Sequence, residues 1–292
     1  MNATEPIVVE VRRGDVVEAV HLVHAVAVRG GEVVAGAGDP ALVCFMRSSS
    51  KPLQALPLAR ARDDLSDDDL AIASASHRAT EDQIAAVRAL LAKAPATEND
   101  LELGLQEGRP PERIYHNCSG KHAGMLALCR AEDWETHGYR LPSHPVQRAC
   151  ADAHVEAAEV AFDAMPTATD GCGVVTFALS LEQMAHAYAR LESLPADGVD
   201  FALMRAQPGW IAKGGAEGLL CAAGPGGIGV ALKVEDGASR PQSPALAAFL
   251  GRLEIELPEL AVVPLTNSRG DRVGELSVPN AKRSFTDPLQ PD

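Results

Sequence analysis

Two periodicities of apolar residues divide this chain into strand-like ends and a helical middle. Runs rich in β-branched residues, separated by the Gly-Asp and Gly-Gly pairs typical of hairpin turns, begin the sequence, and similar runs return near its end. We expect strands at residues 7–11, 17–28, 32–35, 218–222, 229–234, 260–263 and 272–276. The first three predict an antiparallel meander.

Between these strands, apolar residues recur at the spacing of amphipathic helices. The spacing predicts helices over residues 48–61, 66–76, 80–94, 119–134, 145–162 and 180–194. Ser66 is followed by three aspartates, and Thr80 has a glutamine three residues later. Both arrangements are typical of helix N-termini, where a side-chain oxygen and negative charge stabilise the first turn.

The order of strands, helices and strands favours an α+β fold. One antiparallel sheet built from both termini, with a helical lobe inserted between them, satisfies this order without long crossing connections. No change in composition divides the chain, so residues 1–292 are expected to form a single domain. Residues 284–292 lack periodicity and contain two prolines, so they are expected to fray.

Charge and cysteine content limit the partners and the compartment. The 292 residues carry a formal net charge of −14, which argues against nucleic-acid binding because that affinity depends on clustered Lys and Arg. No leader-like start and no membrane-spanning apolar stretch is evident, so we expect a soluble cytoplasmic protein that binds no membrane. The six cysteines lack the close spacing of a secreted disulfide scaffold, and most are interpreted as free thiols.

A Ser-x-x-Lys sequence, Ser48 to Lys51, follows an apolar run and opens a predicted helix. Residues three apart share one face of a helix, so a lysine that loses its proton there could accept one from the serine. The helix N-terminus would stabilise an oxyanion. Ser49 and Ser50 lack this spacing and are equally well explained as ordinary residues of a helix start.

Two cysteines differ from the others. Cys118 and Cys172 lie in turns rich in Gly, Asn and Asp, where a thiolate can be stabilised by a nearby cation or a helix N-terminus. No further cysteine or histidine completes a structural zinc motif, which leaves open a metal held by two thiolates and one more protein ligand. The remaining cysteines are interpreted as small core residues, namely Cys44, Cys129, Cys150 and Cys221.

Five segments, in this order, resemble the Rhizobium-type (class 3, asparaginase II) L-asparaginases. They are RSSSKP at 47–52, ASH at 75–77, HNCSGKHAGM at 116–125, DGCG at 170–173 and AKGGAEG at 212–218. The resemblance spans roughly residues 5–280. It implies a fold similar to that of serine β-lactamases and penicillin-binding proteins, and a homodimer.

The resemblance also implies roles for individual side chains. Ser48 matches the nucleophile of the family and Lys51 its partner base, whereas Ser76 and Lys233 resemble a second Ser-Lys pair on the opposite wall of the cleft. The family pattern departs at Arg78, where we expect a smaller or more polar residue.

A zinc site and a substrate site are implied in the same way. Cys118, Lys121 and Cys172 match the residues around the zinc position of the family, about one ion per chain. The segments that carry them also contain residues implied to bind substrate, namely Arg47, His122 and Asp170. A cation for the α-carboxylate and an acid for the α-ammonium suit a zwitterionic amino acid such as L-asparagine.

These observations predict hydrolysis of L-asparagine to L-aspartate and ammonia through a serine acyl-enzyme. L-Glutamine stays open as a substrate, because one methylene changes binding by only about 1–3 kcal/mol. A β-lactam-interacting serine enzyme is a second alternative, although the Lys-Thr-Gly strand motif is absent. A non-catalytic protein that binds a metal or an amino acid is the third.

Overall fold

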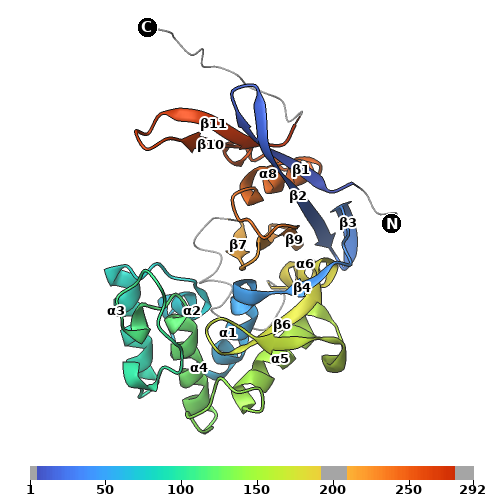
Figure 1. Cartoon of the computed structure of the whole chain (residues 1–292). Coiled ribbons are helices and arrows are strands. Elements are labelled where there is room, and N and C mark those ends of the chain that lie inside the picture. Colours follow the sequence, from blue (N-terminus) through green and yellow to red (C-terminus); the bar gives the residue numbers. More distant parts are fainter. Residues whose placement is uncertain (1–4, 192–208, 280–292) are drawn as a thin grey trace.

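Strands from both ends of the chain join one antiparallel sheet (Figure 1). The computed structural model describes residues 5–191 and 209–279. The strand order is β10-β11-β1-β2-β9-β8-β7, and β3 pairs with β2. The strands are β1 (Ile7–Arg13), β2 (Val16–Arg29), β3 (Glu32–Ala37), β7 (Ile211–Gly214), β8 (Leu219–Gly224), β9 (Ile228–Val234), β10 (Val262–Thr266) and β11 (Arg272–Ser277).

The middle of the chain forms a helical lobe beside this sheet (Figure 1). Its helices are α1 (Lys51–Ala61), α2 (Asp67–Ser74), α3 (Glu81–Lys93), α4 (Ser119–Ala131) and α5 (Pro145–Ala158). A small antiparallel sheet accompanies them, formed by β4 (Val43–Phe45), β6 (Val175–Ser180) and β5 (Thr167–Thr169). Two more helices pack on the large sheet, α6 (Leu181–Ala189) and α8 (Gln242–Gly251).

The predicted α+β class is confirmed, since the sheet combines strands from both ends of the chain with an inserted helical lobe. The strands β4, β5, β6 and β7 and the helix α8 were not predicted. Five of the six residues of β6 are buried, so its sequence shows no alternation, and α8 is nearly all apolar and shows no polar face. The predicted helix end at 194 and the tail 284–292 lie outside the described residues.

The large sheet is covered on both faces where it meets the lobe. Along β2, exposed and buried residues alternate from Val20 to Val23, but Ala25 to Val28 are buried without interruption. Ala25 and Ala27 pack in a cluster with Phe249 and Leu250 of α8. Val26 and Val28 face the other way, into the core shared with α6 and the helical lobe. No helix within the described ranges is long and apolar enough to span a membrane.

Helix α6 lies unusually close to the sheet at one glycine of β9. A Cβ atom placed on Gly229 would lie 1.9 Å from the Ala185 carbonyl oxygen and 2.4 Å from the Ala189 nitrogen. Both atoms belong to backbone, which cannot move aside without shifting the helix. Only glycine permits this contact between the sheet and the lobe.

We therefore expect Gly229→Ala to destabilise the fold by about 3 kcal/mol or more, the upper range for overpacking. Chemical denaturation measures the change in unfolding free energy. Gly36→Ala is the matched control, because Gly36 also lies in a strand and a Cβ there would meet nothing within 4 Å. Equal stability of the two variants would show that α6 can retreat at little cost.

Candidate active site

The chain enters the site through a tight turn that the small sheet and β7 hold in place. A 3-10 helix spans Arg47–Ser50 and leads directly into α1. Arg47 has a positive φ of 50° and donates its backbone N–H to the Thr176 hydroxyl on β6. The Ser49 hydroxyl donates to the Lys213 carbonyl on β7, 2.8 Å away. This turn is therefore fixed to both sheets.

Lys51 is the buried cation of this site. Its side chain is 1% exposed. Its Nζ donates to the Ala75 carbonyl (2.6 Å), the Ser76 hydroxyl (3.0 Å) and the Asn117 carbonyl (3.3 Å). Three acceptors match the three protons of an ammonium group. Burial lowers the pKa of Lys51, and the Lys121 charge contributes in the same direction.

Ser76 lies between two lysines, one of which was not predicted. Lys213 of β7 donates to the Ser76 hydroxyl at 2.9 Å and to the Gly214 carbonyl at 2.9 Å. Burial and the nearby Lys51 charge lower the pKa of Lys213 to about 7. At neutral pH, a large fraction of this amine is therefore free to accept a proton.

The predicted pairing of Ser76 with Lys233 is wrong. Lys233 lies on β9 between β2 and β8, and its amine donates to the Val234 carbonyl on its own strand. Lys213 reaches Ser76 because β7 is the strand at the end of the sheet, in contact with the Arg47–Ser50 turn. Lys213 belongs to the segment 212–218, so the sequence did contain the signal.

The predicted contact of Ser48 with Lys51 is not formed either. All three acceptors of the Lys51 amine are other groups, because a buried ammonium is best stabilised by the two carbonyls and the hydroxyl that surround it. Ser48 is half-buried, and within the described ranges its hydroxyl has no hydrogen-bond partner. The neighbouring Ser50 differs, since it is fully buried and bonds His154.

The two distinctive cysteines meet at the N-terminus of α4. Lys121 donates to the Cys172 sulfur at 3.1 Å, and all three side chains are at most 4% exposed. A hydrogen bond from the Cys172 thiol lowers the pKa of Cys118, and the charges of Lys51 and Lys121 lower it further. Burial acts in the opposite direction but is outweighed. That same bond and burial raise the pKa of Cys172. The pair therefore carries one thiolate, on Cys118.

These three side chains suit a soft divalent cation. Two sulfurs and one nitrogen are the donor types that zinc prefers. Burial alone would lower the pKa of Lys121, but its interactions with the Cys172 and Cys118 sulfurs more than offset this effect and raise the pKa. Lysine would have to lose its proton to become a ligand. Counting only His, Cys, Asp and Glu, residues 5–191 and 209–279 contain no cluster of three that could hold a metal.

The predicted substrate-binding residues lie around this cluster. Arg47 and Asp170 form an ion pair, with 2.5 Å between Nε and Oδ1, and Asp170 Oδ2 lies 3.8 Å from the Cys172 sulfur. His122 is fully buried, and its Nδ1 lies 2.6 Å from the Tyr139 hydroxyl. Its other ring nitrogen, Nε2, is buried and has no partner in the described part of the chain.

His77 links the Ser76 loop to the cysteine segment. Its backbone N–H donates to the Asn117 carbonyl at 3.2 Å, and its Nε2 lies 2.8 Å from the Ser119 hydroxyl. Burial and the Lys51 charge lower the pKa of His77 to about 4, so the ring is neutral. The neutral ring holds Ser76 and Cys118 in a fixed relation. Sequence reasoning included His77 in a segment but gave it no role.

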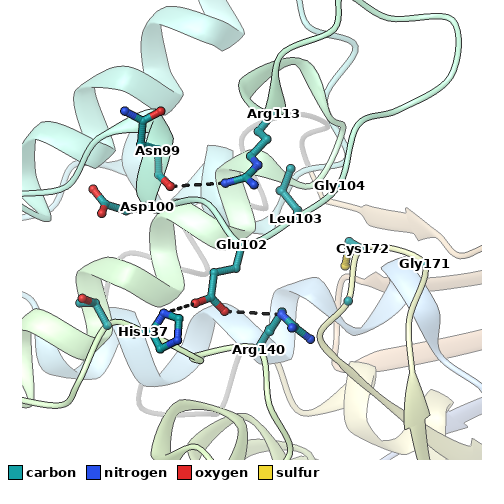
Figure 2. A pocket seen from close by; sticks show the side chains of 12 residues that line it. Asn99, Asp100, Glu102, Leu103, Gly104, Arg113, His137, Arg140, Gly171 and Cys172 are labelled. Atoms are coloured by element: carbon teal, nitrogen blue, oxygen red, sulfur yellow. Dashed lines mark hydrogen bonds and ion pairs between the residues drawn. The ribbon is translucent and has the colours of Figure 1, made fainter.

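A polar pocket of about 670 Å³ opens beside Cys172 (Figure 2). Glu102 lies at its centre, 3.2 Å from His137 Nδ1 and 3.6 Å from Arg140 Nε. Arg113 on the opposite side donates to the Leu101 carbonyl at 2.9 Å. The pocket connects solvent with the turn that carries Cys172 and is wide enough for an amino acid.

Comparison with known families decides the relationship of this chain. The model of the family described as L-asparaginase II matches residues 9–199 and 195–278. The chain belongs to the L-asparaginase II family. Membership of this family supports amidohydrolase activity. A comparison with curated proteins finds no match.

Solved structures with a similar arrangement include two hydrolases. A β-lactamase from Mycobacterium bovis has 16% sequence identity and a TM-score of 0.46, covering 79% of this chain and 94% of that one. A probable glutaminase from Bacillus subtilis, complexed with 6-diazo-5-oxo-L-norleucine, has 14% identity and a TM-score of 0.39. That match covers 80% of this chain and 85% of the glutaminase.

Proposed function

We propose that this protein hydrolyses the side-chain amide of L-asparagine to give L-aspartate and ammonia. The observation that carries the proposal is the Ser76 hydroxyl held between Lys51 and Lys213, within a member of the L-asparaginase II family. Two amines of lowered pKa around one hydroxyl form a proton-transfer centre. Amide hydrolysis needs such a centre, because a proton must leave the nucleophile and another must reach the leaving nitrogen.

Ser48 is the nucleophile in this proposal. Nucleophilic attack uses a lone pair of the hydroxyl oxygen, and the Ser48 hydroxyl has no hydrogen-bond partner among the described residues. Ser76 already accepts two hydrogen bonds from lysines, so its lone pairs are engaged. This difference favours attack by Ser48 and proton relay by Ser76.

The reaction then has two steps. Ser48 attacks the carboxamide carbon, and its proton passes to Lys51 in the neutral form that the lowered pKa of this amine favours. Ser76 connects Lys51 with Lys213 for delivery of a proton to the departing nitrogen. The C–N bond breaks, ammonia leaves and an ester joins Ser48 to the β-carbonyl. Water, deprotonated by the same centre, cleaves this ester to release L-aspartate and restore the hydroxyl.

The Arg47–Asp170 ion pair suits the other end of the substrate. Its side chains are 29% and 10% exposed, so it lies at the border between the protein and the solvent. An amino acid carries one negative and one positive group, and can exchange with the pair by placing its α-carboxylate on Arg47 and its α-ammonium on Asp170. Charge balance is kept throughout.

The residues that would hold zinc are Cys118, Lys121 and Cys172, as buried sulfur and nitrogen donors. Zinc bound there would supply a positive charge beside the substrate. A homodimer is the expected assembly. L-Glutamine is the alternative substrate, and a β-lactam or simple amino-acid binding without turnover are the alternatives from other classes.

Ammonia release from L-asparagine and L-glutamine, measured side by side, tests the proposal. We expect turnover of L-asparagine, its loss in Ser48→Ala, and retention of most activity in Ser49→Ala, whose hydroxyl donates to the Lys213 carbonyl. Hydroxylamine should trap the acyl group of the wild type as a hydroxamate. Loss of activity in Ser49→Ala but not in Ser48→Ala would contradict the nucleophile assignment, and preferred turnover of L-glutamine would change the substrate.

The two lysines of the sheet give a matched pair of variants. Lys213→Met should lower kcat by roughly a hundredfold or more, whereas Lys233→Met should stay near wild type. Because the pKa of Lys213 is lowered to about 7, kcat of the wild type should fall as pH drops through 7, where the amine gains a proton. A pH–rate profile in Lys213→Met should lack this limb. If kcat of Lys213→Met still falls as pH drops through 7, the titrating group is not Lys213.

Zinc content tests the cysteine pair. We expect about one zinc per chain in protein prepared without chelator, and its loss in the Cys118→Ser and Cys172→Ser double variant. Zinc occupancy should fall at low pH, because all three ligands must be deprotonated. Cys129→Ser is the control, since Cys129 is buried in the same lobe within the apolar core. Elemental analysis that finds equal zinc in both variants would refute the site.

A further inference from the structure

Only one of the two nitrogens of the buried His122 ring has a hydrogen-bond partner among the described residues. Its Nε2 has no partner, whereas its Nδ1 lies 2.6 Å from the hydroxyl of Tyr139, which is also fully buried. A buried polar group without a partner destabilises the fold, because it has lost its hydrogen bonds to water without gaining others. Proteins retain such an unpaired group at binding sites, where a bound ligand supplies the missing hydrogen-bond partner.

Tyr139 is itself fixed in position. It lies in the turn after α4, and its hydroxyl oxygen accepts a hydrogen bond from the Glu102 backbone N–H at 2.8 Å. Its carbonyl accepts from Gln147 Nε2 at 2.9 Å. The preceding residue, Gly138, donates its N–H to the Glu102 carboxylate at 2.6 Å. Tyr139 is therefore held against Glu102, which lines the pocket in Figure 2.

Counting protons selects one tautomer of the neutral ring. If the Tyr139 hydroxyl donates to Nδ1, every proton is paired except one, the N–H on Nε2. If Nδ1 donates instead, both the Tyr139 proton and the Nε2 lone pair are left without a partner within the described ranges. The first arrangement leaves one unpaired group and the second leaves two. The first is therefore the stable one.

We propose that Tyr139 is a positioning residue that holds His122 as a hydrogen-bond donor, with its Nε2–H kept free for an acceptor oxygen of the bound amino acid. The two nitrogens lie on opposite sides of the ring, so Nε2 points away from Tyr139. The charged groups that act on this ring are those of the site, among them Lys121, Cys118 and Lys51. This inference rests on the proposed function for the identity of the ligand, but its tautomer can be measured without turnover.

Nitrogen-15 NMR of histidine-labelled protein tests the tautomer. The wild type should show His122 with a protonated Nε2 and a bare Nδ1, its signals assigned by their loss in His122→Gln. Tyr139→Phe keeps the ring and removes the hydroxyl, so the two His122 nitrogen signals should move towards each other as the tautomers mix. Tyr188→Phe is the matched control, because it removes another buried hydroxyl, the donor to the Ser49 carbonyl at 2.8 Å.

Activity provides the second readout. We expect Tyr139→Phe to raise KM for L-asparagine roughly tenfold with little change in kcat, the effect of one weakened hydrogen bond to bound substrate. Saturation of the wild type with L-aspartate should shift the Nε2–H proton. A merely structural Tyr139 would lower the melting temperature but leave the His122 signals unchanged.

Several outcomes would overturn the inference. The first is an unprotonated Nε2 in the wild-type spectrum, and the second is His122 signals in Tyr139→Phe that equal those in Tyr188→Phe. The third is coordination of added zinc by Nε2, and the fourth is a His122 spectrum that does not change when L-aspartate is added. Because the wild-type spectrum alone decides the tautomer, the test survives a variant that fails to fold. If the tautomer is found but neither L-asparagine nor L-glutamine is hydrolysed, the proposed function fails separately.

Discussion

The burial of one positive charge organises this site. Lys51 is removed from water, and its ammonium must find three acceptors among groups that the chain can place around it. Two of these are backbone carbonyls, of Ala75 and Asn117, which lie in loops before α3 and α4. The lysine thus fixes the loop that carries Ser76 and the segment that carries Cys118 relative to α1. His77 strengthens the same connection from the other side, through Asn117 and Ser119.

The charges near Lys51 are arranged so that few remain uncompensated. Cys118 carries a thiolate close to Lys51 and Lys121, Arg47 faces Asp170, and Lys213 has its pKa lowered to about 7 and can become neutral. A cluster of lysines in one cleft would otherwise repel itself. The same balance makes the site chemically useful, because a lysine poised between its two protonation states can both accept and donate a proton near neutral pH.

Much of this was predictable from the sequence, and the failures have identifiable physical causes. The amphipathic helices and the terminal strands follow from apolar periodicity, and the segments around Cys118 and Cys172 did converge. The strand β6 and the helix α8 were missed because a fully buried strand and an apolar helix have no polar face to reveal their period. Lys233 was preferred to Lys213 because a sequence does not show which strand lies at the end of the sheet beside the catalytic turn. The expected contact between Ser48 and Lys51 ignored the competition from backbone carbonyls, which only a folded chain brings near.

The close approach of α6 to Gly229 affects how the site loses its geometry when the protein begins to unfold. Lys51, Ser76 and Cys118 belong to the helical lobe, but Lys213 comes from the large sheet, so the two amines that bond the Ser76 hydroxyl are supplied by different layers. The distance between these two amines depends on how closely the helices pack on the sheet. At Gly229 the backbones of α6 and β9 are already in close contact, so they cannot move closer together. A displacement of about an ångström between the layers would break the bond between Lys213 and Ser76 while each layer kept its own core. Heat or denaturant should therefore break the contact between Lys213 and Ser76 before secondary structure is lost.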